Sequence, residues 1–293
     1  MSLYKNPNVR AGLRQAWARA ALWLAIRFRS RLAVRRLAQQ FLSPRSRRSP
    51  SAAERAQFDA ARRFMFDFQG EQLVGYRFGS GPKVLLLHGL GGSASQMYAF
   101  VQPLVAAGFE VVALDAPAHG ESGGSWIAIP RYGAAIAQLA EHEGPMHALI
   151  AHSLGAPAAT FALRLGLQTE RMVFVGAPAD AFVYFILWAR SLGLPGRLTA
   201  RVRAEIEARA GYPMELLNAE RMGDVLRAPL LVIHDREDRE VPWHDGERVR
   251  RSARDGRMLT TTGLGHRRIL HDAQVVQAAV EFIGSPQPHA RVA

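Results

Sequence analysis

The sequence predicts an α/β fold, with a mostly parallel, doubly wound sheet, a small helical cap and a basic N-terminal helical extension. Short apolar runs alternate with helix-like stretches from about residue 64 to residue 284, a pattern typical of parallel strands covered by helices on both faces. Glycine or acidic residues follow several of the apolar runs, where strands would end. A chain of 293 residues can bury one substantial core, so we expect a single main domain over 64–284.

The N-terminal extension, residues 1–63, carries nearly all of the net charge. It holds 15 Lys and Arg and only two acids, a charge of +13, whereas the rest of the chain holds 22 basic and 23 acidic residues. Residues 10–42 contain no proline and no glycine after Gly12, which predicts a helix. Two apolar stripes run along it, one including Leu13 and Trp17 and the other Trp23 and Ile26. Residues 43–52, rich in Ser, Pro and Arg, predict an exposed linker.

Two interpretations of this helix remain open: it docks on the main domain, or it lies on an anionic membrane surface through residues 10–42. Its stretch that is apolar all round spans seven residues, 20–26, far short of the ~20 that cross a bilayer. No signal-peptide cleavage site is evident. We therefore expect a cytoplasmic protein, which under the second interpretation is peripheral at the membrane. Nucleic acid is a third possible partner of this basic segment, but the segment has no motif for sequence recognition, so we expect no specific binding to nucleic acid.

The main domain should begin with a hairpin and continue as alternating strands and helices. Between residues 177 and 228 the chain is too long for a simple connection, so we expect a helical cap there. Its apolar run 181–190 can form the core of the cap or line a substrate pocket, and we expect part of it to face the cleft. Residues 285–293 are expected to form a flexible tail. The expected strands lie near 64–68, 72–78, 83–88, 109–114, 146–152, 171–176, 229–234 and 256–261, and the helices near 94–107, 130–142, 154–166, 244–253 and 268–283.

The segment 146–157 predicts a nucleophile elbow. A short apolar run ends at Ser153, Ala151 and Gly155 stand two places on either side, and a helical stretch follows. A serine on such a sharp strand-to-helix turn holds its hydroxyl above the sheet, and only small neighbours fit there. The usual first glycine of the motif is Ala151 here.

Three more segments contribute to the same pattern. The strand at 83–88 runs into His88-Gly-Leu-Gly-Gly92, a turn whose backbone N–H groups can face a developing negative charge. His266 stands on a glycine-flanked loop before the last helix, a context that suits a general base. The strand at 229–234 delivers a loop with four candidate carboxylates, Asp235, Glu237, Asp238 and Glu240. The chain order is thus serine, acid, histidine.

Together these segments resemble the α/β-hydrolase superfamily, in its single-domain members with a serine nucleophile and a short cap. The resemblance runs over about 64–284 and includes Asp115-Ala-Pro-Ala-His-Gly-Glu-Ser122, which is similar to the family turn D-x-P-G-x-G-x-S, with Ala118 in place of a glycine. In the family this turn is architectural, so Asp115 and His119 are expected to be structural.

The resemblance implies a role for five residues. Ser153 matches the nucleophile and His266 the base, while Asp238 matches the acid of the family pattern D-x-x-V-P. The backbone N–H groups of Leu90 and Leu154 match the oxyanion hole. The implied activity is hydrolysis of carboxylic esters or thioesters through an acyl-enzyme, on a lipophilic small molecule. The rival hypothesis is a catalytically silent binding protein on the same scaffold, held at a membrane by its basic helix.

No cofactor and no metal are expected. The chain has no cysteine, which excludes disulfides and thiolate chemistry, and its histidines lack the spacing of metal ligands.

Overall fold

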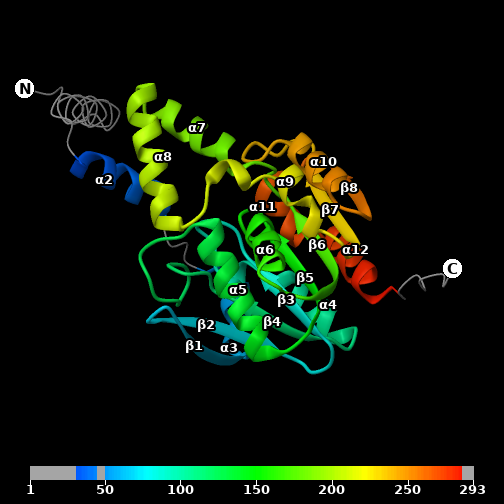
Figure 1. Cartoon of the computed structure of the whole chain (residues 1–293). Coiled ribbons are helices and arrows are strands. Elements are labelled where there is room, and N and C mark those ends of the chain that lie inside the picture. Colours follow the sequence, from blue (N-terminus) through cyan, green and yellow to red (C-terminus); the bar gives the residue numbers. More distant parts are fainter. Residues whose placement is uncertain (1–30, 45–49, 286–293) are drawn as a thin grey trace, which may run out of the picture.

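The computed structural model describes residues 31–44 and 50–285 (Figure 1). At its centre is an eight-stranded sheet in the order β1-β2-β4-β3-β5-β6-β7-β8. The pairs β1–β2 and β2–β4 are antiparallel, and every pair from β4 onwards is parallel. The carboxyl ends of β3 to β8 therefore meet at one edge. The strands are β1 Arg62–Phe68, β2 Glu71–Phe78, β3 Lys83–Leu87, β4 Glu110–Leu114, β5 Met146–His152, β6 Thr169–Val175, β7 Leu230–Asp235 and β8 Gly256–Thr261.

Helices cover both faces of the sheet, which explains why the central strands are apolar along their whole length. In β3, Val84 and Leu86 face one core cluster while Leu85 and Leu87 face the other. The first cluster includes residues of α4 Tyr98–Ala106 and α12 Ala273–Gly284. The second includes residues of α5 Ile129–Glu143, α6 Gly155–Arg164 and α10 Trp243–Ser252. The predicted α/β fold with its mostly parallel, doubly wound sheet is confirmed.

The segment between β6 and β7 is helical. It contains α7 Ala181–Ser191, α8 Gly196–Ala210 and α9 Ala219–Met222, with 3-10 turns at Met214–Leu216 and Gly223–Val225. Phe185 and Trp188 of the apolar run are buried in the core of this cap, against Phe41, whose ring lies 5.4 and 5.1 Å from theirs. Three of the four aromatic side chains of the run thus pack within the cap, whereas Tyr184 donates to Asp245 of α10 at 2.7 Å. Val183 and Leu187 are exposed.

The N-terminal region contributes two helices to the described structure. The helix predicted over 10–42 is represented by α2 Arg31–Leu42, which packs against α8, and residues 10–30 lie outside the described residues. Of the linker predicted over 43–52, residues 45–49 also lie outside them, and Ser51 caps a helix, α3 Ala52–Asp59, that we did not expect. Phe58 of α3 packs on Tyr76 and Phe78 of β2 at 5.0 and 5.1 Å between ring centroids.

In the part of the chain that the structure describes, no helix combines the length and apolar character needed to span a bilayer. The residues of the expected C-terminal tail from 286 on are outside the described range.

Candidate active site

The elbow at Ser153 has the strained geometry that its sequence predicts. Strand β5 ends at His152, Ser153 follows with φ +50°, and α6 begins at Gly155. This left-handed backbone costs a non-glycine residue roughly 1–2 kcal/mol. A Cβ on Gly155 would lie 2.8 Å from the carbonyl oxygen of Leu87, so the helix can approach β3 only because this position is glycine. The seryl N–H donates to the carbonyl of Val175 at 3.0 Å and ties the elbow to β6.

The structure brings Ser153, His266 and Asp238 into one hydrogen-bonded chain. Nε2 of His266 lies 3.0 Å from Oγ of Ser153, and its Nδ1 lies 2.7 Å from Oδ2 of Asp238. His266 stands at the start of α11 Gly265–Arg268, after β8, and Asp238 stands on the loop after β7. Both side chains are buried. These distances let the imidazole accept a proton from the hydroxyl while it donates one to the carboxylate.

Asp238 is held as a carboxylate by the donors around it. Burial raises its pKa, but bonds from His234, His266 and the backbone outweigh that effect and hold the pKa well below its usual range. Its Oδ1 accepts from the N–H groups of Glu240 and Val241 at 2.8 and 2.9 Å. Asp238 therefore stays charged wherever the protein is folded at ordinary pH.

The other three candidate acids do not contact His266 within the described residues. Asp235 accepts from the Thr261 hydroxyl at 2.7 Å and from the Leu264 N–H at 3.0 Å, so it fixes the loop that leads to His266. Glu240 pairs with Arg267 at 3.0 Å, and Glu237 is exposed. Asp238 is the only one of the four that contacts His266 in the described structure.

Two buried histidines next to this chain were not predicted. Nε2 of His234 donates to the carbonyl of Val241 at 2.9 Å and lies 3.5 Å from Oδ2 of Asp238, so it closes the acid loop onto β7. Nε2 of His152 donates to the carbonyl of His266 at 2.9 Å, and the two rings lie 4.7 Å apart. Burial lowers the pKa of His152 to about 3, so its ring is neutral. His234 thus positions the backbone of the loop that carries Asp238, and His152 positions the backbone of His266.

The loop after β3 passes directly beside the elbow. A Cβ on Gly89 would lie 2.8 Å from Cβ of Ser153, which places the backbone around Leu90 next to the serine. His88 holds this loop: its Nδ1 donates to the carbonyl of Gly89 at 2.7 Å and its Nε2 accepts from the Ala116 N–H at 3.0 Å. Leu90 leaves 54% of its surface exposed. Leu154 directly precedes α6, so the predicted N–H groups lie on segments that flank Ser153.

The turn that begins at Asp115 supports this loop. Oδ1 of Asp115 accepts from the Ala94 N–H at 2.7 Å, and its Oδ2 accepts from the Glu121 N–H at 2.9 Å. Nε2 of His119 accepts from the N–H of Gly91 at 2.9 Å. Ala118, which stands where the family has a glycine, has φ +66°, so this substitution carries backbone strain as well as a small change in size.

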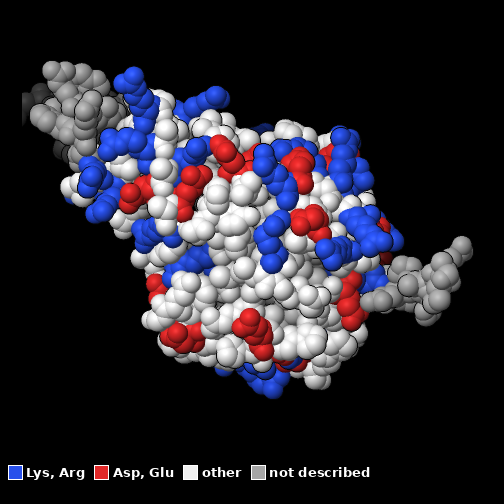
Figure 2. Space-filling model, in the orientation of Figure 1, with Lys and Arg blue, Asp and Glu red and all other residues white. Residues whose placement is uncertain are grey.

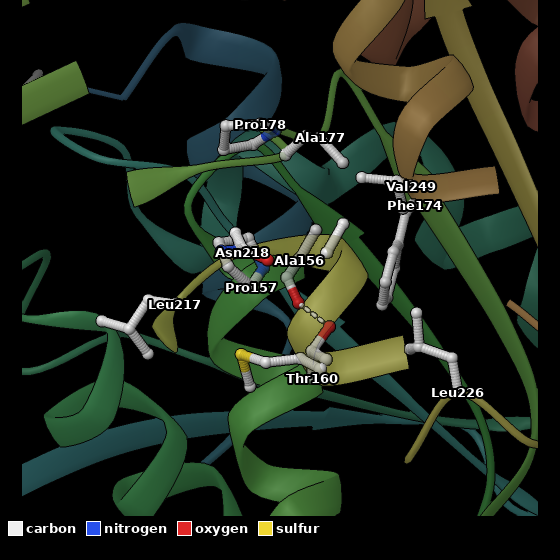
Figure 3. Close-up of a pocket in the computed structure, with 13 residues that line it drawn as sticks. Ala156, Pro157, Thr160, Phe174, Ala177, Pro178, Leu217, Asn218, Leu226 and Val249 are labelled. Carbon is white, nitrogen blue, oxygen red and sulfur yellow. Dashed lines mark hydrogen bonds between the residues drawn. The ribbon is translucent and has the colours of Figure 1, made fainter. Parts of the chain in front are cut away.

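A small hollow lies beside the first turns of α6 (Figure 3). It encloses about 20 Å³ and is lined mainly by apolar side chains of α6, the β6–α7 connection and α9. A hollow of this size holds about one water molecule. It therefore cannot take an acyl chain unless the surrounding side chains move.

Within the described residues, no group of three or more His, Cys, Asp or Glu side chains is arranged to hold a metal ion.

The comparisons with known proteins agree with this architecture. The model of the alpha/beta hydrolase family matches residues 84–278, about two-thirds of the chain. The chain therefore belongs to the alpha/beta hydrolase family. No curated protein sequence matches it.

Several solved structures share the fold at low sequence identity. A thermophilic esterase from Thermogutta terrifontis is 19% identical, with a TM-score of 0.59 over 77% of this chain and 100% of its own. A monoacylglycerol lipase from Paleococcus ferrophilus is 21% identical, with a TM-score of 0.55 over 72% and 98%. A bromoperoxidase from Bacillus anthracis is 17% identical, with a TM-score of 0.58 over 76% and 100%. Their names cover more than one chemistry, so the likeness defines the fold and leaves the reaction open.

Proposed function

We propose that the protein is a serine hydrolase that cleaves carboxylic esters or thioesters through an acyl-enzyme. The observation that carries the proposal is the hydrogen-bonded chain from Ser153 through His266 to Asp238, with 3.0 and 2.7 Å between the bonded atoms. A binding protein has no chemical need for a strained serine aligned with a buried imidazole and carboxylate, whereas acyl transfer needs all three.

In the proposed reaction, the Ser153 hydroxyl attacks the acyl carbonyl while Nε2 of His266 takes its proton. The C–O or C–S bond to the leaving group then breaks, and the same nitrogen returns the proton to the leaving alcohol or thiol. Water attacks the acyl-enzyme with the same base and releases the acid. Asp238 fixes the imidazole tautomer and stabilises its charged form.

The N–H groups of Leu90 and Leu154 are the proposed oxyanion hole. Their segments flank the serine, and the loop that carries Leu90 is held by His88 and His119. A fixed pair of donors stabilises the negative charge of the tetrahedral intermediate without reorganisation. Each donor lowers the activation free energy by about 3–4 kcal/mol.

We propose a lipophilic substrate. One observation supports this choice: Leu90, an apolar residue on the loop beside the serine, leaves 54% of its surface exposed. Such a surface stabilises a bound acyl or alcohol group in proportion to the apolar area that leaves water.

A panel of p-nitrophenyl esters of increasing acyl length, with matched thioesters, tests the proposal. We expect turnover that rises from acetate to medium-chain esters and is lost in Ser153→Ala. Absence of turnover on the whole panel by the folded wild-type protein would favour the silent binding protein instead. Equal turnover by wild type and Ser153→Ala would exclude Ser153 as the nucleophile.

A further inference from the structure

Five exposed arginines of α2, α7 and α8 have neither an acidic partner nor an aromatic ring beneath them in the described structure, unlike Arg209, which lies over the Trp126 ring. They are Arg31 and Arg36 of α2, Arg190 of α7, and Arg197 and Arg201 of α8. In the part of the chain that the structure describes, none of them forms an ion pair, whereas their neighbours Arg35 and Arg203 do. We call the outer surface of α2, α7 and α8 the cap face. Figure 2 shows arginines gathered over this end of the molecule.

The three arginines of α10, in contrast, are paired. Arg248 pairs with Glu220 at 2.7 Å, and Arg250 and Arg251 both pair with Glu247 at 3.0 Å. Their charge is balanced within the molecule. On the cap face, the five unpaired guanidinium groups leave a local excess of positive charge that an anionic partner can neutralise.

The same surface exposes large apolar side chains. Leu32 of α2 leaves 57% of its surface exposed, and Val183 and Leu187 of α7 leave 44% and 53%. Val183 and Leu187 are four residues apart and so lie on one side of the helix. These three are half of the large hydrophobic residues that the described chain exposes, which distinguishes the cap face from a simple basic patch.

A hollow of about 390 Å³ lies between α7 and α8. Its walls are mostly apolar and include Phe182, Ile186 and Leu194, and Arg190 and Arg203 also border it. Arg203 is occupied by Glu215 and Glu207 and lies over the Phe182 ring. Arg190 has no ion pair among the described residues. An apolar hollow with a free cation beside it fits an acyl chain that ends in an anionic head group.

The chain that precedes α2 continues this chemistry. Residues 1–30 hold six basic and no acidic residues, together with Trp17 and Trp23. They join the described structure at Arg31, on the cap face itself. The sequence directly before α2 is thus basic and contains aromatic residues, a composition that suits a membrane interface.

We propose that the cap face docks on a lipid bilayer that contains anionic lipids. The arginines contact lipid phosphates, and Leu32, Val183 and Leu187 enter the boundary between head groups and acyl chains. The hollow between α7 and α8 takes the acyl chain of one anionic lipid, with Arg190 on its phosphate. This inference concerns binding alone and holds whether or not the protein hydrolyses esters.

Co-sedimentation of the full-length protein with vesicles tests the proposal. The vesicles are phosphatidylcholine, with or without phosphatidylglycerol. We expect binding that requires phosphatidylglycerol and weakens with salt. Each basic side chain near the surface contributes about 1 kcal/mol, so the triple variant Arg190→Glu, Arg197→Glu, Arg201→Glu should bind about 100-fold more weakly or worse. The matching Arg→Lys triple should bind within about threefold of wild type, because it keeps the charge.

A matched control separates the cap face from net charge. Arg221, Arg227 and Arg254 are exposed outside the cap face, on α9 and shortly before β7 and β8, and form no ion pair in the described structure. Their triple Glu variant makes the same change in net charge and should lose less than about tenfold. Leu187→Ser, with no change in charge, should also weaken binding several-fold.

Three results would overturn the proposal. One is equal loss in both Glu triples, which would mean that only net charge matters. Another is unchanged binding in the cap triple, which would assign any membrane contact to residues before α2. The third is binding of the wild type to RNA but not to vesicles. Circular dichroism of every variant, and unchanged midpoints of thermal unfolding, establish that the differences do not come from misfolding.

Discussion

Replacing Asp238 by asparagine should stop the proposed reaction while leaving the fold intact. The amide oxygen can still accept from the N–H groups of Glu240 and Val241, so the loop keeps its bonds. The amide nitrogen then takes the place of Oδ2, 2.7 Å from Nδ1 of His266. Two donors cannot share that position, so the proton moves to Nε2, which faces the Ser153 hydroxyl and can no longer accept from it.

The size of the loss follows from the number of interactions that change. The variant loses both the correct tautomer and the negative charge beside the imidazolium. The equivalent substitution in a serine protease lowers kcat about 10⁴-fold, which corresponds to about 5.5 kcal/mol in the barrier. We expect a loss of this order in kcat for p-nitrophenyl ester hydrolysis, with KM nearly unchanged, because Asp238 is too deeply buried to contact substrate.

Glu237→Gln is the matched control. It removes a carboxylate from the same loop at an exposed position, and we expect kcat within about twofold of wild type, since surface changes of this kind have small effects. Retention of more than a tenth of the wild-type kcat by Asp238→Asn would refute the assignment of Asp238. An equal loss in both variants would mean that the loop acts through its charge and not through one contact.

Three further predictions follow from particular distances and angles. Gly89→Ala places a Cβ 2.8 Å from Cβ of Ser153 and 3.0 Å from Nδ1 of His152. We expect kcat to be about 10²–10³-fold lower, which is the effect of losing one oxyanion donor, with an unchanged circular dichroism spectrum. Wild-type activity of this variant would contradict the prediction. Ala118→Gly removes the strain of φ +66° and should raise the free energy of unfolding, measured in urea, by about 1 kcal/mol. A Cβ costs roughly 1–2 kcal/mol in the left-handed region, and the extra entropy of glycine in the unfolded chain costs less than that. A lower free energy of unfolding would refute the prediction. Burial lowers the pKa of His88 to about 4 and that of His152 to about 3. Below about pH 6.5 the unfolded chain therefore binds more protons than the folded protein. The free energy of unfolding should fall as the pH drops towards 4, by up to about 2.7 kcal/mol per pH unit for the two groups together. A free energy of unfolding that stays constant from pH 6.5 to 4.5 would contradict this.

The sheet and the serine elbow could be predicted because their signals are local. A fully apolar strand, a serine between small residues and a following helix occupy twelve consecutive positions, 146–157, and the backbone angle of Ser153 follows from that pattern. The acid was harder, since four carboxylates stand within six residues. The resemblance to the family selected Asp238, and the structure places that carboxylate against His266.

The histidines that support the site could not be predicted from such patterns. His152 bonds to the carbonyl of a residue more than a hundred positions later, and His119 accepts from the loop of Gly91. These contacts depend on how the strand ends converge, which the sequence does not encode locally. His234 did leave a signal, because it precedes Asp238 by four residues and sits at the end of a buried strand.

The start of α3 carries a local sequence signal that opposes the predicted linker. Ser51 and Glu54 form a capping box at the start of α3: the Glu54 N–H donates to Oγ of Ser51, and the Ser51 N–H donates to the Glu54 carboxylate. The pattern S-x-x-E marks a helix start, although the surrounding prolines and serines suggested a linker. No local pattern indicates which side of α7 is buried, because Phe185 and Trp188 pack against α2, a helix far away in the sequence.

Labelling with a fluorophosphonate probe, followed by mass spectrometry of the digested protein, tests most directly whether Ser153 is an activated nucleophile. The probe reacts rapidly with a serine whose hydroxyl gives its proton to a neighbouring base, and far more slowly with other serines. We expect a single labelled peptide that contains Ser153, absent in Ser153→Ala and at least about a hundredfold slower to form in His266→Ala. Folded wild-type protein that stays unlabelled, or a label on another serine, would contradict the account.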